Sequence, residues 1–386
     1  MNQIKIYKIE LAKVLQTKPN NLFLYWKGRV ALYAALKTIG VTKGDEVIMP
    51  AFTCVVVPNA VKYLGATPIY VDVNQETYNS DLNKIKDKIS GKTKAVLVQN
   101  TFGLSSEVDS ITAYCKSQKI TTIEDCTHGF GGYFEGKPNG SYCDFAFYSS
   151  QWNKPFSTGI GGFLLVNNEQ YLAGIERVNM DLKKPTLKER VMLRLLLFAY
   201  SFVLKEWNYW KIVGLYRWLS KKGIVVGSSD NGEITGITIP NDYFKTASSI
   251  QCSAGLGSLN KFDSIQKLRK KNAVDYSEFL SANNKIRVDS KLFKNHSFLK
   301  YPLLVKNRDR FMEIAEANQI KLGEWFTSPL HPIQGSLVLW DLNIKNYPNA
   351  EYLARHVVNL PTDIKDSSRV LLFLKENLSE LINTND

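Results

Sequence analysis

Two residues in the first half of the chain could carry out chemistry on an amino group. Lys154 lies between a predicted strand that ends in serine and a glycine-rich turn, with no acidic residue near it in the sequence. A lysine amine whose pKa is lowered by burial or by neighbouring cations attacks carbonyl carbon. Asp125 ends a β-rich run, where a buried carboxylate requires a cationic or N–H partner. The ordinary alternatives are a lysine in a surface loop and an aspartate that caps a helix.

Two further groups could bind an anion and a ring. Gly28 and Arg29 open the amphipathic segment RVALYAALKTIG, and the start of a helix offers free N–H groups and a positive dipole to a phosphate. Arg29 could add a bidentate contact, although most helices that begin with glycine bind nothing. His128 follows Asp125 by three residues, so it could lie against the same ring or be an ordinary core histidine.

One cofactor would use all of these groups. Pyridoxal 5'-phosphate needs a lysine for its aldehyde, an aspartate for its pyridine nitrogen and donors for its phosphate. The glycine-led helix comes first, then Asp125, then Lys154 after 154 − 125 = 29 residues. This order resembles that of the fold-type I pyridoxal-phosphate enzymes.

The elements that must position these residues alternate between short apolar runs and helix-length segments. Apolar runs of this kind predict strands of a mostly parallel sheet that is covered on both faces. Ligands of such sheets bind beyond the carboxyl ends of the strands, where Asn100, Asp125 and Ser149 close their runs. The predicted strands are residues 47–50, 68–73, 95–100, 121–125, 145–149 and 163–168.

Several blocks of the chain resemble the DegT/DnrJ/EryC1/StrS family of nucleotide-sugar aminotransferases, in the family's own order. They cover nearly the whole chain except about residues 179–236. The blocks are GRVALYAALKTIGVTKGDEVIMPAFTCVVVPNAVKYLGATPIYVDV, YNSDLNKIKDKISGKTKAVLVQNTFG, IEDCTHGFGG, SSQWNKPFSTGIGG, SIQCSAGLGSLNKFD and YPNAEYLARHVVNLPTD.

The resemblance implies an α/β protein of PLP fold type I, like aspartate aminotransferase. We expect a large, mostly parallel α/β/α sheet domain at residues 1–245, with a basic and aromatic helical insertion at about 179–236. A smaller C-terminal α/β domain is expected at residues 246–386. The family also implies a homodimer whose sites lie at the subunit interface.

The resemblance assigns roles to the residues already singled out. Lys154 would form the Schiff base with the cofactor and move the proton, and Asp125 would keep the pyridine nitrogen protonated. His128 falls beside the ring, and Cys54 falls where an aromatic side chain often stacks on it. The positions that bind the phosphate are Gly28, Arg29 and Ser149.

The chain departs from the family pattern at several of these positions. Arg29 replaces a serine or threonine, and Ile160 replaces a glutamate in the glycine-rich turn. Because Cys54 cannot stack, the stacking group must come from elsewhere, with His128 as one candidate. Two family residues that reach the partner's cofactor are replaced by Phe244 and Thr246, and Lys245 is a candidate substitute. His331 either lines the substrate cleft or is structural.

The predicted function is therefore amino transfer from glutamate to a keto-sugar, linked to a nucleotide, for surface polysaccharide or amino-sugar synthesis. A dehydratase branch of the family carries histidine in place of the lysine, so Lys154 argues against it. The other alternative is a non-catalytic, membrane-associated scaffold in glycan assembly. The pairing of Asp125 with Lys154 argues against a scaffold, which has no need of it.

The composition of the chain argues against several other classes of protein. The 386 residues include 49 Lys and Arg against 36 Asp and Glu, a net charge of +13, and 44% are hydrophobic, as in folded globular proteins. Residues 183–222 alone hold ten basic against two acidic residues. Because the charge is local and no reading motif is present, nucleic acid is not an expected partner. The five cysteines have no CxxC spacing, so neither a metal site nor a disulfide framework is expected.

The basic, aromatic segment at 187–219 suits either of two surfaces. It could dock peripherally on an anionic membrane, or it could form a helical hairpin that packs on the partner subunit or covers the active site. Its longest uncharged apolar run, 195–204, has ten residues, and a membrane-spanning helix needs about twenty. The N-terminus lacks the apolar run of a signal peptide. We expect a cytoplasmic protein, with the inner face of the membrane as a second location.

Overall fold

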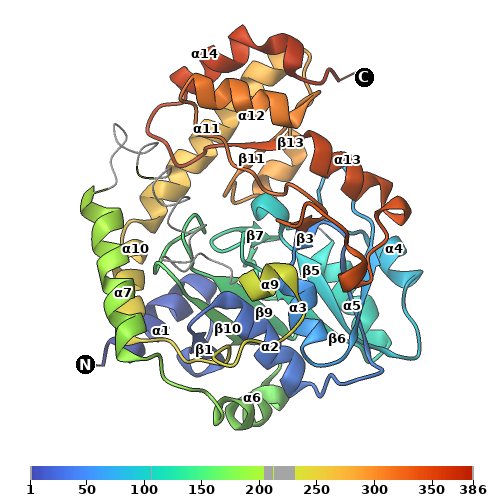
Figure 1. The fold of residues 1–386 in the computed structure, drawn as a ribbon, viewed down its shortest axis with the longest axis vertical. Helices are drawn as coiled ribbons and strands as arrows, with labels where there is room; N and C mark the ends of the chain where they lie inside the picture. The colour runs from blue at the N-terminus through green and yellow to red at the C-terminus, as the bar shows by residue number, and fades with distance from the viewer. Residues whose placement is uncertain (1, 106, 204–211, 213–230, 385–386) are drawn as a thin grey trace.

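A seven-stranded sheet is the centre of the computed structural model, which describes residues 2–105, 107–203, 212 and 231–384 (Figure 1). Four successive strand pairs, which reach one edge of the sheet, are parallel, while the two pairs at the opposite edge are antiparallel. In spatial order the strands are β1 (Leu22–Tyr25), β10 (Gly162–Val166), β9 (Phe145–Ser149), β6 (Thr121–Asp125), β5 (Thr93–Gln99), β2 (Glu46–Pro50) and β4 (Thr67–Val71). The predicted mostly parallel sheet is confirmed.

Helices cover both faces of this sheet, so that its strands are buried on both sides. One face packs against α2 (Gly28–Thr38), α3 (Val56–Lys62) and α6 (Leu172–Asn179). The opposite face of the sheet packs against four helices. They are α1 (Gln3–Leu15), α4 (Leu82–Lys86), α5 (Val108–Ser117) and α10 (Ser249–Leu259). This burial explains why the strand sequences are apolar runs without alternation.

The C-terminal part builds a second, smaller core. A two-stranded antiparallel sheet joins β11 (Tyr301–Leu304) to β13 (Val357–Leu360). It packs with helices that stand at the top of Figure 1. They are α11 (Phe262–Ala282), α12 (Arg308–Ala317) and α14 (Ser368–Glu376). The division of domains at residue 245 stays a prediction.

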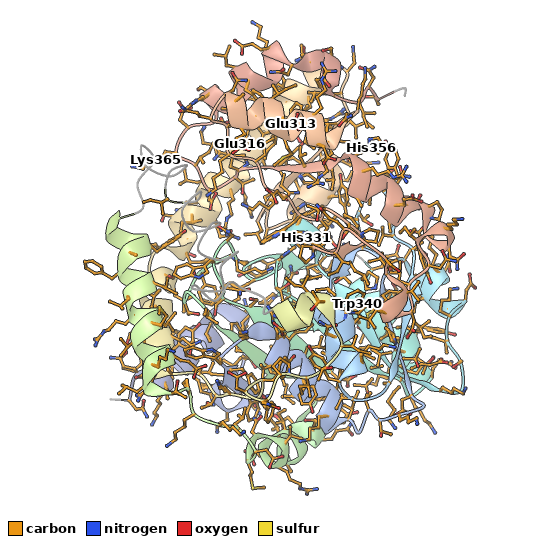
Figure 2. The ribbon with its side chains drawn as sticks, in the orientation of Figure 1. Glu313, Glu316, His331, Trp340, His356 and Lys365 are labelled. Atoms are coloured by element: carbon orange, nitrogen blue, oxygen red, sulfur yellow. The ribbon has the colours of Figure 1, made fainter. Side chains whose placement is uncertain are left out.

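The connection between β11 and β13 returns to the large sheet and closes over its edge. Within it, β12 (Leu330–His331) pairs in parallel with β3 (Thr53–Cys54). The indole N–H of Trp340 donates to Asn59 Oδ1 of α3 at 2.6 Å. Figure 2 shows His331 between the C-terminal helices and the sheet. The same connection contains α13 (Pro348–His356), and a small hairpin, β7 (Tyr133–Phe134) with β8 (Lys137–Pro138), lies elsewhere.

The described part of the insertion begins with α7 (Leu187–Phe198), which lies beside α10 in Figure 1. A capping box between Thr186 and Glu189 starts α7. Leu193 is buried, but Leu195 and Phe198 are about 60% exposed. The short α9 (Asn231–Thr235) follows, and residues 204–211 and 213–230 lie outside the described residues. Among the described residues, no helix is long and apolar enough to cross a membrane.

Candidate active site

The carboxyl ends of two neighbouring strands carry the central groups. Asp125 is the last residue of β6 and Ser149 the last of β9, and the two strands pair in parallel. Lys154 follows β9 in the turn that leads to β10. A hydrogen bond from the Lys154 N–H to the Gln151 carbonyl, 3.1 Å long, shapes this turn. The sheet therefore places three of the predicted residues at one edge.

Lys154 is surrounded by charged and titratable groups from separate segments. Desolvation lowers the pKa of its amine to about 8; Cys54 and Asp125 act in the opposite direction, while Arg29 lowers this pKa further. Burial also raises the pKa of the Cys54 thiol, so that this thiol is neutral. With a pKa of about 8, about a tenth of the Lys154 amine is unprotonated at pH 7, far more than for an ordinary lysine, and this is the form required for attack on a carbonyl.

Asp125 is almost fully buried, at 4% exposure. Its Oδ1 accepts a hydrogen bond from the Thr127 N–H at 2.9 Å. Burial raises the pKa of this carboxyl, and the Thr127 hydrogen bonds and the nearby Lys154 oppose that rise. Asp125 is therefore a desolvated carboxylate that favours a cationic or N–H partner.

His128 is held between aromatic rings. Its ring stacks on Trp325, with centroids 4.5 Å apart and planes 8° from parallel, and on Phe102 at 6.4 Å. The Phe102 N–H donates to His128 Nδ1 at 3.2 Å, which leaves the proton of the neutral ring on Nε2. Burial and Lys154 hold the pKa of His128 well below its ordinary value. The ring is thus a fixed, neutral N–H donor.

Trp325 brings an aromatic ring to the amine from the C-terminal part of the chain. Its ring centroid lies 4.3 Å from Lys154 Nζ. The backbone N–H of Trp325 donates to Asn359 Oδ1 at 2.9 Å, and this hydrogen bond connects the segment to β13. Sequence reasoning missed Trp325, and its only signal was its position six residues before His331.

The start of α2 lies against the end of β9. A Cβ on Gly28 would fall 2.9 Å from both Ser149 Cβ and the Tyr148 carbonyl oxygen, so only glycine fits there. Gly28 and Ser149 are therefore neighbours, as a shared phosphate site requires. Free N–H groups at the start of this eleven-residue helix add the donors for an anion.

Arg29 has a partner that the sequence did not indicate. Its guanidinium forms an ion pair with Glu233 Oε2 of α9, and Lys27 Nζ lies 4.0 Å from the same oxygen. Glu233 is 1% exposed and Arg29 8%. A carboxylate from the end of the insertion thus contacts the cation that was expected to bind phosphate. Neither residue spacing nor a motif could have revealed this contact.

His331 and Lys245 occupy different surroundings. The pairing of β3 with β12 sets His331 opposite Cys54, and burial together with Lys154 and Arg308 lowers the pKa of His331 to about 4. Lys245 instead forms ion pairs within the chain, to Glu189 and Asp242, both at 2.6 Å. His331 therefore belongs to the surroundings of Lys154, whereas the Lys245 ammonium is held on the chain's own carboxylates.

The chain is similar to known sugar aminotransferases in sequence and in fold. The model of the DegT/DnrJ/EryC1/StrS aminotransferase family matches residues 26–193 and 241–367. GDP-perosamine synthase of Escherichia coli O157:H7 is 27% identical over 355 residues, which is 92% of this chain and 83% of that protein. A Pseudomonas aeruginosa enzyme, UDP-2-acetamido-2-deoxy-3-oxo-D-glucuronate aminotransferase, is 30% identical over 52% of this chain and 59% of its own length.

The fold is also that of solved aminotransferase structures. The aminotransferase TlmJ from Streptoalloteichus hindustanus aligns over 98% of this chain and 91% of its own, with a TM-score of 0.73 and 18% identity. The unmatched stretch between the two family segments overlaps the insertion predicted at 179–236. The fold-type I architecture is confirmed, and the cofactor of this family is pyridoxal phosphate. The chain belongs to the DegT/DnrJ/EryC1/StrS aminotransferase family.

Proposed function

We propose that this protein transfers an amino group from glutamate to a keto-sugar linked to a nucleotide, with pyridoxal 5'-phosphate as cofactor. The observation that carries the proposal is the Lys154 amine, whose pKa is lowered to about 8, beside the buried Asp125 carboxylate at the strand ends. A deoxysugar dehydratase of this family would have histidine at position 154. A scaffold would have no use for a desolvated lysine and aspartate, which lower stability unless they bind something.

The donor set fits the cofactor. The close approach of Gly28 to Ser149 leaves no room for a Cβ at the start of α2, where N–H groups and Arg29 would hold the phosphate. Asp125 would accept the hydrogen bond of the pyridinium N–H, and His128 Nε2 offers a donor beside the ring. When bound, pyridoxal phosphate supplies an aldehyde that bonds to amines and a ring that withdraws electrons from the adjacent carbon.

The residues around that group have separate tasks. Lys154 holds or releases a proton near neutral pH, so its Nζ is suited to move a proton from and to the substrate carbon. The Trp325 ring lies 4.3 Å from this amine and His331 is close enough to be affected by its charge, so both would limit the access of water to it. Burial raises the pKa of the Cys54 thiol, which makes it a poorer proton donor.

The substrate class rests on the relatives. GDP-perosamine synthase and the oxo-glucuronate aminotransferase carry GDP and UDP in their names, and the second acts on a 3-oxo sugar. A nucleotide-linked keto-sugar is anionic, which suits a chain with a net charge of +13. Glutamate as donor, the homodimer and a cytoplasmic location belong to the same proposal.

The outer face of α7 exposes apolar side chains, which another surface would bury. Val191 and Leu195 are exposed by 49% and 59%, on a helix that also carries Arg190 and Arg194. The partner subunit or the headgroups of an anionic membrane would cover it. Co-sedimentation with anionic liposomes at low salt separates the two, because only membrane docking retains the protein in the pellet.

The activity is tested by incubating the cofactor-loaded protein with glutamate and measuring 2-oxoglutarate. The proposal predicts about one 2-oxoglutarate per site without a sugar acceptor, because the amino group stays on the cofactor. Aspartate and alanine serve as comparison donors. Absence of 2-oxoglutarate from a protein that has bound the cofactor would refute glutamate as donor.

A further inference from the structure

Two cations of the C-terminal part lie beside the candidate active site. Arg269 of α11 is 3% exposed, and its Nε lacks a hydrogen-bond partner among the described residues. Burial lowers the pKa of this guanidinium to about 10. Lys300, directly before β11, is half-buried. Burial lowers the pKa of its ammonium, and the charge of Arg269 adds to this shift. The two desolvated cations are therefore close enough to repel each other.

The carboxylate of Asp363 balances only part of this charge. Although burial raises the pKa of Asp363, Lys300 and Arg269 lower it below its usual value. Among the residues that the structure describes, neither cation forms a direct ion pair with this carboxylate. We call Arg269, Lys300 and Asp363 the Lys300 cluster, which holds two positive charges and one negative charge. Because desolvated cations without a close anion are costly, the cluster favours a bound carboxylate.

Hydrogen bonds hold the three segments of the Lys300 cluster together. The side-chain amide of Asn272, one turn after Arg269 on α11, donates to the carbonyl of Thr362 at 2.8 Å. The Thr362 hydroxyl donates to the carbonyl of Leu299 at 3.1 Å. Thr362 and Leu299 each directly precede a member of the cluster. The fold therefore fixes the positions of the three charged residues relative to one another.

The Lys300 cluster lies next to the ring of His128. The Lys300 N–H donates to the Phe102 carbonyl at 3.3 Å, and the Phe102 N–H donates to His128 Nδ1 at 3.2 Å. Besides burial, the charges of Lys154 and Lys300 both lower the pKa of His128. The charge of Lys300 also adds to the effect of burial on the Lys154 amine. The cluster is therefore close to the group that would react with a substrate.

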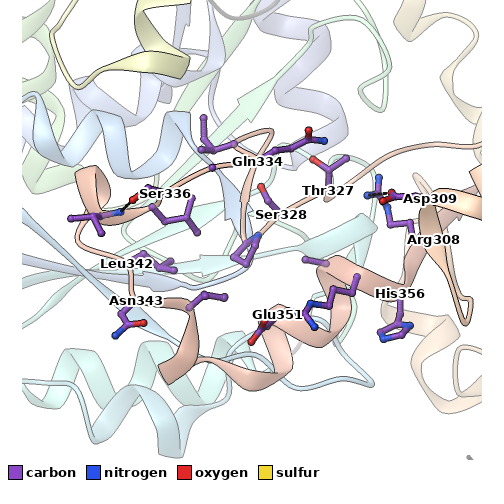
Figure 3. A pocket seen from close by; sticks show the side chains of 18 of the residues that line it. Arg308, Asp309, Thr327, Ser328, Gln334, Ser336, Leu342, Asn343, Glu351 and His356 are labelled. Carbon is purple, nitrogen blue, oxygen red and sulfur yellow. Dashed lines mark hydrogen bonds and ion pairs between the residues drawn. The ribbon is translucent and has the colours of Figure 1, made fainter.

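The Lys300 cluster is separate from a larger space near the same amine. A pocket of about 980 Å³ lies between the connection that follows β12, the start of α12 and the end of α13 (Figure 3). Its lining includes Thr327, whose hydroxyl lies 3.0 Å from His331 Nδ1. None of the three cluster residues is among the described residues that line this pocket. The pocket has room for a bulky substrate, so the cluster suits a smaller one.

We propose that the Lys300 cluster binds the side-chain carboxylate of the amino donor and thereby selects a dicarboxylic amino acid. This inference rests on the proposed function, because it assigns residues to the donor of that reaction. In glutamate this carboxylate is separated by two methylene groups from the carbon that carries the amino group, and that carbon must lie beside Lys154. Lys300 is the specificity-determining residue, and the buried Arg269 adds its positive charge.

The test measures the half-reaction of the cofactor-loaded protein with glutamate and with glutamine, its uncharged isostere, by the change in cofactor absorbance. Lys300→Gln should lower the second-order rate constant for glutamate by about tenfold or more, and that for glutamine by less than about twofold. A change in the pKa of Lys154 would affect both donors equally, so the ratio isolates the carboxylate. Lys300→Arg, which keeps the charge, should fall between wild type and Lys300→Gln.

Binding without reaction is measured by calorimetric titration of the cofactor-loaded protein with glutarate, a dicarboxylate that has no amino group. Lys300→Gln should weaken this binding by about tenfold. Asp363→Asn removes the competing carboxylate, so it should strengthen binding, and it decides the question if Lys300→Gln does not fold. Lys294→Gln is the matched control and should bind as wild type does, because Lys294 is 67% exposed and pairs with Glu135 at 2.9 Å.

Three results would overturn the proposal: equal losses for glutamate and glutamine in Lys300→Gln, an equal loss in Lys294→Gln, or unchanged glutarate binding in Lys300→Gln. Glutarate binding that depends on Lys300 while the glutamate rate does not would place a carboxylate of the acceptor there instead, and would also overturn it. A protein that binds glutarate through Lys300 but never reacts with glutamate would refute the proposed function and leave an anion site. Reaction with glutamate that is indifferent to Lys300 would refute this site alone.

Discussion

Lys154 is the residue that we propose reacts with the cofactor, and its immediate surroundings set the pKa of its amine. Burial and Arg29 favour the neutral amine, while Cys54 and Asp125 favour the charged one, and the balance is a pKa of about 8. Only the neutral amine attacks the cofactor aldehyde. The reaction of Lys154 with an aldehyde should therefore depend on pH around pH 8.

The rate at which the cofactor-free protein takes up pyridoxal phosphate should rise with pH and level off above about pH 8. Below that pH the amine is protonated, so each further pH unit downward slows uptake by about tenfold. Stopped-flow absorbance at a series of pH values measures this rate. A profile that is flat from pH 6 to pH 9 would show that another group limits the reaction.

Glu233 pairs with Arg29 and lies 4.0 Å from Lys27 Nζ, so in the proposed phosphate site it would compete with phosphate for both cations. Glu233→Gln removes the competing charge, so the Kd for pyridoxal phosphate should fall by roughly threefold to tenfold. The same change leaves Arg29 buried with a weaker partner, so the free energy of unfolding without cofactor should fall as well. Equilibrium binding and denaturant unfolding measure the two effects.

Glu169→Gln is the control for that substitution, because Glu169 pairs with Lys18 on an exposed surface. It should change neither quantity. Weaker cofactor binding in Glu233→Gln would mean that Glu233 supports the site instead of competing in it.

At the scale of elements, the close packing of α2 on β9 is the most demanding feature of the site. Gly28→Ala would place a Cβ 2.9 Å from Ser149 Cβ, so it should lower the free energy of unfolding by about 1–3 kcal/mol and weaken cofactor binding. Gly257→Ala, within α10, meets no atom within 4 Å and should raise stability by about 0.5–1 kcal/mol. Similar effects of the two substitutions would contradict the packing argument.

The predicted strands and the catalytic edge follow from local patterns, and the contacts that complete the site do not. All six predicted runs are strands because their burial on both faces makes them apolar, and the ends of β6 and β9 bring Asp125 and Ser149 to one edge. The antiparallel β1 and the stacking of Trp325 on His128 join segments far apart in the sequence. Such contacts depend on how the chain returns to the sheet, and no periodicity encodes that.

The whole molecule consists of a sheet that holds the reactive groups and a C-terminal part that closes over them. Trp325 and His331 both come from the connection that crosses from β11 to β13, so the site depends on both parts being in place. The helix α7 also exposes apolar side chains on its outer face.

Light scattering should give the mass of a dimer, 2 × 43.8 = 87.6 kDa. If the partner subunit covers α7, the double substitution Val191→Glu and Leu195→Glu should shift the mass toward the monomer, because two charges would be buried in the contact. Lys188→Glu, at the exposed start of the same helix, is the control. A wild-type protein that is monomeric at micromolar concentration would contradict the homodimer.

The central claim is that Lys154 is the residue bonded to the cofactor. Reduction of the cofactor-loaded protein with borohydride, followed by peptide mass spectrometry, locates the lysine that is bonded to it. We predict that the phosphopyridoxyl group is found on the peptide containing Lys154 and is absent from Lys154→Arg. A group found on another lysine, or none in wild-type protein saturated with pyridoxal phosphate, would contradict the central claim.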